Sequence, residues 1–225
     1  EPPHYPYQGP NDGPVRSVGQ GRGKGETRQS SEDVQRAYRE MVEEMDKGIG
    51  EIIAALREHD LDRKTLVMFF SDNGGYGPIP YATGGLPGAK GALSEGGTRV
   101  PCILEWPGRV KEPFVTTVPA CTIDFYPTVL DLLDIEMPNE AGPIDGISLL
   151  PLIDGKMDRR PQPIPLVSGQ AVRLIDNEYI LQKGRLFRFD EEERKDVDIT
   201  DEQPEVFQRL TAWEDAWRET VKKDQ

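Results

Sequence analysis

An acidic residue and an amide stand side by side at the end of an apolar run. The run at residues 65–71 is followed by Asp72 and Asn73 and then by two glycines. Carboxylate and amide oxygens are hard ligands of the kind that Ca²⁺ and Mg²⁺ bind. The same residue types are also common in plain turns. Taken alone, this motif therefore predicts either a cation site or a turn.

A single lysine, Lys90, lies among glycines in the segment 84–91. The segment is not a P-loop, because no Ser or Thr follows the lysine, and it also lacks the dinucleotide-binding fingerprint. Its ammonium group and backbone N–H groups could still approach an oxyanion together. The alternative is a solvated lysine on a flexible loop.

The sequence contains two histidines. His4 lies in a proline-rich segment, where the prolines stiffen the backbone and could aim the imidazole at a ligand. An inert histidine is the alternative. His59 follows a predicted helix, and we interpret it as a surface residue favoured by the helix dipole.

The longest predicted element is a helix over residues 32–59. Ser30 or Ser31 supplies an N-cap, and acidic residues follow in the first turn. Apolar residues recur at steps of three and four along one face. Gly48 and Gly50 are costly inside a helix, so we expect a neighbouring segment to pack closely against them.

The remaining elements predict an α/β fold with a smaller second unit. Strands at 65–71 and 100–106, with the helix before them and a helix at 122–134 after them, are typical of a doubly wound, mostly parallel sheet whose central strand is buried on both faces. In such sheets ligands bind beyond the carboxyl ends of the strands, where Asp72 and Asn73 lie. Three prolines at 161–165 indicate a linker. Short strands at 171–175, 178–182 and 185–189 and a helix from Pro204 then predict a small α+β subdomain. The predicted domains are residues 1–160 and 161–225.

The composition excludes several classes of partner. The net charge is −13 and no Lys/Arg stripe is present, which argues against a nucleic-acid partner. No apolar stretch approaches the length of a membrane helix. Cys102 and Cys121 lie in apolar runs and lack the neighbours of a zinc site. We interpret them as buried free thiols, and a disulfide between them stays open.

Several motifs, taken in their order along the chain, closely resemble the type I sulfatases of the alkaline-phosphatase-like superfamily. The resemblance extends from Pro3 to about Leu152. Its motifs are Pro3-His4-Tyr5-Pro6, Ser71-Asp72-Asn73-Gly74-Gly75, Lys90-Gly91 with Ser94-Glu95-Gly96-Gly97-Thr98-Arg99, Trp106-Pro107-Gly108, Asp124-Phe125-Tyr126-Pro127-Thr128 and Asp145-Gly146-Ile147.

The resemblance implies an enzyme that hydrolyses sulfate esters of small molecules or carbohydrates. It makes Asp72 and Asn73 ligands of a divalent cation, Ca²⁺ or Mg²⁺. It makes Lys90 and His4 the groups that contact the sulfate and assist its transfer. It further implies export to the periplasm, the extracellular space or the lysosome.

The sequence departs from the family at the nucleophile. The family uses a formylglycine made from Cys or Ser in a Cys/Ser-x-Pro-x-Arg motif, and neither Cys102 nor Cys121 lies in such a motif. An early Asp pair that completes the cation site is also missing. We therefore expect the C-terminal part of a sulfatase that is inactive alone. The alternatives are a phosphoryl or phosphonate ester hydrolase of the same superfamily, or a non-catalytic binding protein that retains the fold.

Overall fold

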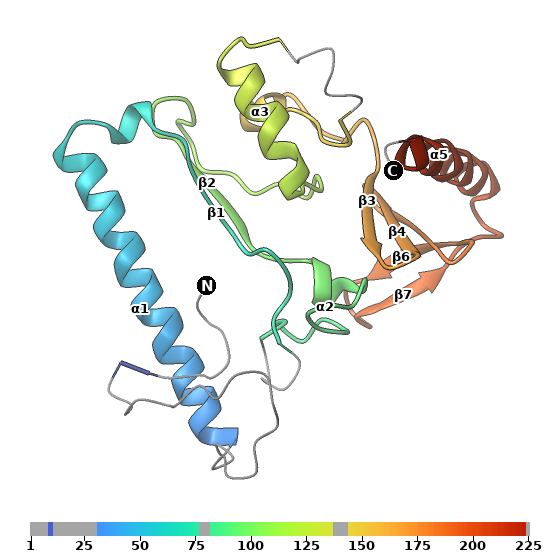
Figure 1. The fold of residues 1–225 in the computed structure, drawn as a ribbon, viewed down its shortest axis with the longest axis horizontal. Coiled ribbons are helices and arrows are strands. Elements are labelled where there is room, and N and C mark those ends of the chain that lie inside the picture. Colours follow the sequence, from blue (N-terminus) through green and yellow to red (C-terminus); the bar gives the residue numbers. More distant parts are fainter. Residues whose placement is uncertain (1–8, 11–30, 77–81, 137–143, 224–225) are drawn as a thin grey trace.

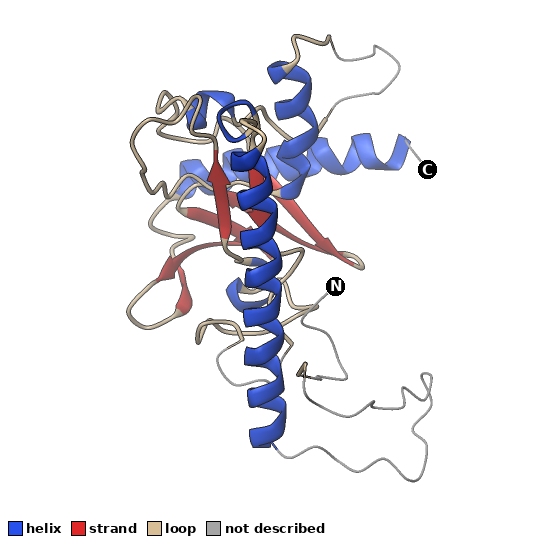
Figure 2. Ribbon diagram, turned by 90° about the vertical axis from the view of Figure 1, so that its left-hand side faces the viewer, coloured by secondary structure: helices blue, strands red, loops and turns tan. Residues whose placement is uncertain are grey.

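The computed structural model describes residues 9–10, 31–76, 82–136 and 144–223 (Figure 1). A long helix, α1, lies on one side of a two-stranded ribbon, β1 and β2. A five-stranded sheet covered by the last helix, α5, lies on the other side. The short helix α2 stands between the ribbon and the five-stranded sheet. In the view turned by 90°, α5 runs across the direction of α1 (Figure 2).

Helix α1 extends from Ser31 to Glu58, which confirms the predicted helix. Ala37 of this helix is buried and packs with Val34, Tyr38, Met41 and Ala82. The expectation of close packing at Gly48 and Gly50 is wrong for the described part of the chain. A Cβ added at either glycine would meet no described atom within 4 Å.

Strands β1 (Val67–Phe70) and β2 (Cys102–Glu105) follow a 3-10 turn, η1 (Asp62–Lys64). They pair antiparallel, with Val67 opposite Glu105 and Phe70 opposite Cys102. The expectation that the first strand is parallel and buried on both faces is therefore wrong for this pair. Parallel neighbours need a long crossover, usually a helix, and the connection between β1 and β2 holds only the four-residue helix α2 (Glu95–Thr98) among its described residues.

The predicted helix at 122–134 is divided into a 3-10 turn, η2 (Thr122–Asp124), and helix α3 (Phe125–Leu132). Asp124 is fully buried and joins three segments. Its carboxylate accepts hydrogen bonds from the backbone N–H groups of Cys121 and Ile147 and from both terminal nitrogens of Arg160. A further short helix, α4 (Leu150–Ile153), follows.

The C-terminal sheet is an antiparallel meander in the order β3-β4-β5-β6-β7. Its strands are β3 (Ile164–Ser168), β4 (Ala171–Asp176), β5 (Tyr179–Gln182), β6 (Arg185–Asp190) and β7 (Lys195–Asp198). The three predicted strands are confirmed as β4, β5 and β6. The interpretation of residues 161–165 as a linker is wrong from Ile164 onward, because Pro165 pairs with Leu174. Proline is tolerated there since β3 is an edge strand.

Helix α5 (Pro204–Lys223) covers one face of this sheet. The resulting core contains Val172, Leu174, Leu181, Leu186, Ile199 and Leu210, with Trp213 and Trp217 packed against it. The side chains of β4 alternate between the two faces of the sheet. Val172 and Leu174 therefore face α5, and Arg173 faces away from it.

Both cysteines are free thiols, as predicted, but they are not buried. Cys102 is exposed and Cys121 is half-buried. The reason is that β2 is an edge of its two-stranded ribbon, so its apolar composition does not place it in a core. None of the helices in the described ranges is both long and apolar enough to cross a lipid bilayer.

Candidate functional site

The acidic turn, residues 71–75, leaves the carboxyl end of β1. Ser71 Oγ donates a hydrogen bond to the carbonyl oxygen of Asn73 at 2.9 Å, which holds the chain in a bend. Asp72 is exposed and Asn73 is half-buried. The oxygens of both side chains are therefore accessible to a ligand.

The lysine loop, residues 82–99, carries Lys90 and ends in α2. Gly88 and Gly91 adopt φ angles of +86° and +91°, which residues with a Cβ rarely adopt. Lys90 itself is exposed. These glycines therefore allow the backbone to turn so that the Lys90 side chain is exposed to solvent.

Backbone contacts join the acidic turn to the lysine loop. The Gly74 N–H donates to the Gly97 carbonyl oxygen and the Lys90 N–H donates to the Gly75 carbonyl oxygen, each at 2.9 Å. A Cβ added at Gly74 would lie 1.9 Å from the Gly96 carbonyl oxygen. Only glycine fits at position 74, because the two backbones lie so close together. The close contact and the two hydrogen bonds hold the acidic turn and the lysine loop in one arrangement. The structure thus brings the predicted cation ligands and the predicted sulfate-binding lysine onto adjoining loops.

The third predicted element of the site lies outside the described residues. His4 belongs to residues 1–8, so its role in contacting the sulfate stays a prediction. His59 is exposed directly after α1, in agreement with its interpretation as a surface residue.

The acidic turn offers oxygen ligands of the type that a divalent cation binds. It supplies only some of the ligands that such a cation needs. Ca²⁺ takes six to eight oxygen ligands, and Asp72 with Asn73 offers a carboxylate and an amide oxygen. In the described portion of the chain, no three or more His, Cys, Asp and Glu residues converge on one point that could hold a metal ion. Any cation bound here would need further oxygen ligands.

A buried ionic cluster behind the lysine loop was not predicted from the sequence. The Arg173 side chain is fully buried, and its guanidinium contacts Glu95 of α2 at 2.9 Å and Asp196 of β7 at 2.7 Å. The only hint in the sequence is a charged residue inside an apolar strand. Alternation along the strand would place such a residue in solvent, since nothing in the pattern shows that α2 covers it.

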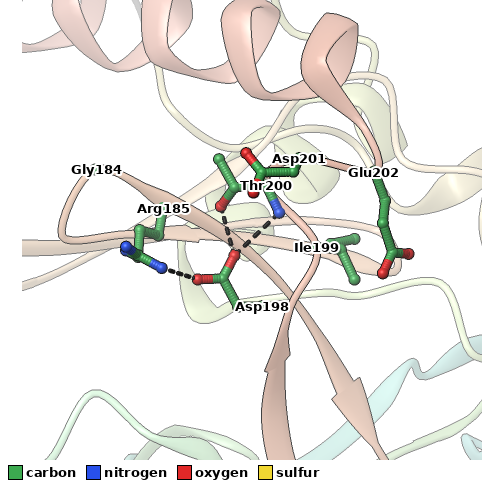
Figure 3. A pocket seen from close by; sticks show the side chains of 7 residues that line it. All are labelled: Gly184, Arg185, Asp198, Ile199, Thr200, Asp201 and Glu202. Carbon is green, nitrogen blue, oxygen red and sulfur yellow. Dashed lines mark hydrogen bonds and ion pairs between the residues drawn. The ribbon is translucent and has the colours of Figure 1, made fainter.

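A separate hollow of about 310 Å³ lies at the end of the C-terminal sheet (Figure 3). Its lining contains the Gly184–Arg185 turn and the acidic segment 198–202. Asp198 accepts hydrogen bonds from Thr200, and these contacts, followed by the ion pair with Arg185, lower its pKa to about 2. Asp198 and Arg185 of this lining are therefore already paired with each other, and none of the predicted site residues that the structure describes lies there. The hollow is not the candidate site.

Comparisons with known sequences converge on one family. Residues 2–135 match the sequence model of the family described as Sulfatase. The chain is 42% identical over 131 residues to a steryl-sulfatase of Mus musculus. The aligned region covers 55% of this chain and 21% of the relative. It is 29% identical over 202 residues to arylsulfatase K of Danio rerio, which covers 82% of this chain and 37% of the relative.

Solved structures give the same result for the fold. The crystal structure described as Ps i-CgsB in complex with a neocarrahexaose superposes with a TM-score of 0.73 at 22% identity, over 85% of this chain and 44% of that chain. A sulfatase, yidJ, from Bacteroides fragilis gives a TM-score of 0.64 at 21% identity. The chain thus has the predicted alkaline-phosphatase-like α/β fold with its C-terminal antiparallel sheet and helix, and it spans less than half the length of these relatives.

Proposed function

The chain belongs to the sulfatase family, and from this premise we propose that the activity of its site is the hydrolysis of sulfate esters. The observation that carries the proposal is the joining of the acidic turn to the lysine loop. Two backbone hydrogen bonds, from Gly74 to Gly97 and from Lys90 to Gly75, join the loops that carry Asp72, Asn73 and Lys90. Sulfated carbohydrates are the proposed substrate class. A 34% identical relative over 129 residues is an N-acetylgalactosamine-6-sulfatase of Sus scrofa.

The proposed roles follow from the charge that develops when a sulfate ester breaks. Negative charge grows on the sulfuryl oxygens and on the leaving alcohol oxygen. The Lys90 ammonium would stabilise that charge, because a preorganised cation costs no reorganisation during the reaction. His4 would donate a hydrogen bond to the same group. Both assignments rest on the family resemblance.

Asp72 and Asn73 would hold the divalent cation, Ca²⁺ or Mg²⁺, through their oxygens. When bound, this ion would add positive charge beside the sulfate. None of the 225 residues lies in a Cys/Ser-x-Pro-x-Arg motif. We therefore assign the formylglycine nucleophile of the family to no residue of this chain.

We further propose the division into residues 1–160 and 161–225 and the export of the protein. The division is supported by the separate core of the C-terminal sheet and α5. Proteolysis that yields a stable fragment beginning near residue 161 would test it. Export is supported by the family resemblance alone, and the location of a tagged protein would test it.

The site assignment is tested by Asp72→Ala and Lys90→Ala in the longest natural polypeptide that contains these residues. Asp72→Ala should weaken cation binding, so added Ca²⁺ should partly restore kcat. Lys90→Ala should lower kcat by about 10²–10³-fold, and no concentration of Ca²⁺ should repair it. Lys64→Ala, which changes an exposed lysine before the opposite end of β1, is the matched control.

The deciding measurement is a Ca²⁺ titration of kcat on an aryl sulfate. A plain turn at Asp72 and a solvated Lys90 would give both variants the kinetics of the wild type and of Lys64→Ala. That result would show that the assignment of Asp72 and Lys90 to the site is wrong.

A further inference from the structure

The lysine loop is held from behind by the C-terminal sheet. Arg173 Nη2 donates to Glu95 Oε1 at 2.9 Å, and Arg173 Nη1 donates to Asp196 Oδ2 at 2.7 Å and to Gln182 Oε1 at 3.0 Å. Glu95 is the first residue of α2, and it is buried together with Gly96 and Gly97. One guanidinium thus ties strands β4, β5 and β7 to the helix that ends the lysine loop.

The contact between Arg173 and Glu95 is linked to the acidic turn by a short path along the backbone and one hydrogen bond. The Gly97 carbonyl oxygen, two residues after Glu95, accepts the hydrogen bond from Gly74 in the turn. The Gly96 N–H donates to the Pro87 carbonyl oxygen at 2.8 Å, which closes the lysine loop on itself. A displacement of Glu95 therefore moves both loops of the candidate site.

Two further contacts from the same sheet reach the same loop. Arg99 donates to Glu191 at 2.7 Å and lies over the ring of Phe189, 5.8 Å from its centroid. Arg194, in the turn between β6 and β7, donates to the Gly84 carbonyl oxygen. Both contacts involve exposed arginines, so Arg173 is the buried member of the set.

Arg173 is not needed for the hydrophobic core of its own sheet. Its neighbours Val172 and Leu174 supply that core on the opposite face. A buried ion pair is often no more stabilising than apolar residues of the same size. In addition, the Arg173 Nε has no hydrogen-bond partner among the described residues, which is costly for a buried group. Stability alone therefore gives little reason for an arginine here.

The carboxylates around Arg173 favour the charged form of its guanidinium. Burial disfavours the charged guanidinium, but the hydrogen bonds and negative charges of Asp196 and Glu95 outweigh burial and raise the pKa of Arg173. The guanidinium therefore stays charged, and its fork holds two carboxylates in fixed directions.

We infer that Arg173 is a positioning residue, which acts through Glu95 to hold Lys90 and the acidic turn in their working geometry. This inference rests on the proposed function. The lysine loop is rich in glycine and α2 is four residues long, so local backbone preference gives both little rigidity. A misplacement of about 1 Å in an active site can cost about 10²-fold in rate. The C-terminal sheet supplies the missing rigidity.

The test compares Arg173→Met with Leu174→Ala in the longest natural polypeptide that contains the chain. The two residues are neighbours on β4 and face opposite sides of it. Arg173→Met should lower kcat by about tenfold to 10²-fold and change KM far less, because Lys90 acts on charge that develops during the reaction. Leu174→Ala should lower the unfolding temperature and leave kcat unchanged well below that temperature.

Glu95→Gln is the second variant, because it keeps the shape of the side chain and removes its charge. It should lower kcat in the same way as Arg173→Met, and the double variant should be no worse than Arg173→Met alone. Should Arg173→Met fail to fold, Glu95→Gln decides the matter. Normal kcat in either folded variant would overturn the inference.

Amide hydrogen exchange separates this inference from the proposed function. Exchange of the Gly74 and Lys90 N–H groups should become faster in Glu95→Gln and in Arg173→Met, and not in Leu174→Ala. This readout needs no enzymatic activity, so it decides the inference even if the wild type hydrolyses no sulfate ester. Unchanged exchange at both amides would overturn the inference, whatever the activity of the wild type.

Discussion

The buried pair of Asp124 and Arg160 should be a main determinant of stability, and its neighbourhood provides an internal control. Both side chains are 0% exposed. The Asp124 carboxylate accepts four hydrogen bonds, two from the guanidinium of Arg160 at 2.7 Å each and two from backbone N–H groups at 2.8 and 2.9 Å. Asp124→Ala would leave a buried cation and two part-buried backbone N–H donors without this acceptor.

The expected loss can be estimated from these contacts. Removing one partner of a buried ion pair typically costs about 3–5 kcal/mol. A domain of ordinary stability has about 5–15 kcal/mol in total. Asp124→Ala and Arg160→Ala should therefore each remove a large fraction of the free energy of unfolding. Asp124→Ala leaves a buried guanidinium that keeps hydrogen bonds to the carbonyl oxygens of Gln162 and Pro119. Arg160→Ala leaves a buried carboxylate that keeps the two backbone N–H groups as donors.

Arg159 is the matched control because it is the adjacent arginine and also binds a carboxylate. Its partner is Glu178, and the two side chains are 58% and 42% exposed. Exposed ion pairs contribute little, since water screens them and the side chains lose entropy. Arg159→Ala should therefore leave the unfolding midpoint close to that of the wild type.

The assay is urea unfolding followed by tryptophan fluorescence. Trp213 and Trp217 report on the C-terminal core, and Trp217 also donates a hydrogen bond to Asp145 at 3.0 Å. The midpoint should fall strongly for Arg160→Ala at an unchanged m-value. Equal midpoints for Arg160→Ala and Arg159→Ala would refute the reasoning, because they would show that burial adds nothing to this pair.

Three further outcomes are expected. Hydrogen bonds from Arg109 and then Lys156 lower the pKa of Asp154 from 3.8 to about 2. A carboxyl whose folded pKa is depressed stabilises the fold above its unfolded pKa and loses that contribution as the pH falls toward the folded value. Asp154→Asn should therefore be less stable than the wild type at pH 5, and the difference should vanish near pH 2 in denaturation curves. Gly48→Ala and Gly50→Ala should each stabilise α1 by up to about 1 kcal/mol, because nothing described lies within 4 Å of either new Cβ; a lower thermal midpoint would contradict this. The isolated 225-residue chain should not turn over an aryl sulfate above a boiled control, because none of its residues is assigned as the nucleophile; measurable turnover would contradict this.

Elements with strong local patterns were predicted well from the sequence. The periodicity of α1 and the short hairpin spacings of β4, β5 and β6 are local signals, and their bounds agree with the structure to within one or two residues. Strand β3 was missed because three prolines obscure it, and an edge position makes one of them acceptable. The pairing of β1 with β2 was missed because an apolar run does not reveal the direction of its partner.

The candidate site was predictable only in part. The order of the motifs assigns Asp72, Asn73 and Lys90 to the site through the family resemblance, and this assignment stays a prediction. The supporting contacts were not predictable. Arg173 and Glu95 are 78 positions apart, and Arg160 and Asp124 are 36 apart. A long-range ion pair leaves no periodicity in a single sequence, so each of these residues resembles an ordinary surface charge.

The two faces of β4 have a consequence for the spectrum of mutations that the protein tolerates. One face packs on α5 through Val172 and Leu174, and the other holds the lysine loop through Arg173. In a library that covers every position, substitutions at 172 and 174 should reduce the amount of protein that accumulates. Substitutions at 173 should in addition reduce the activity of each molecule that does accumulate. Damage of two kinds should therefore alternate along one strand with the period of its pleat.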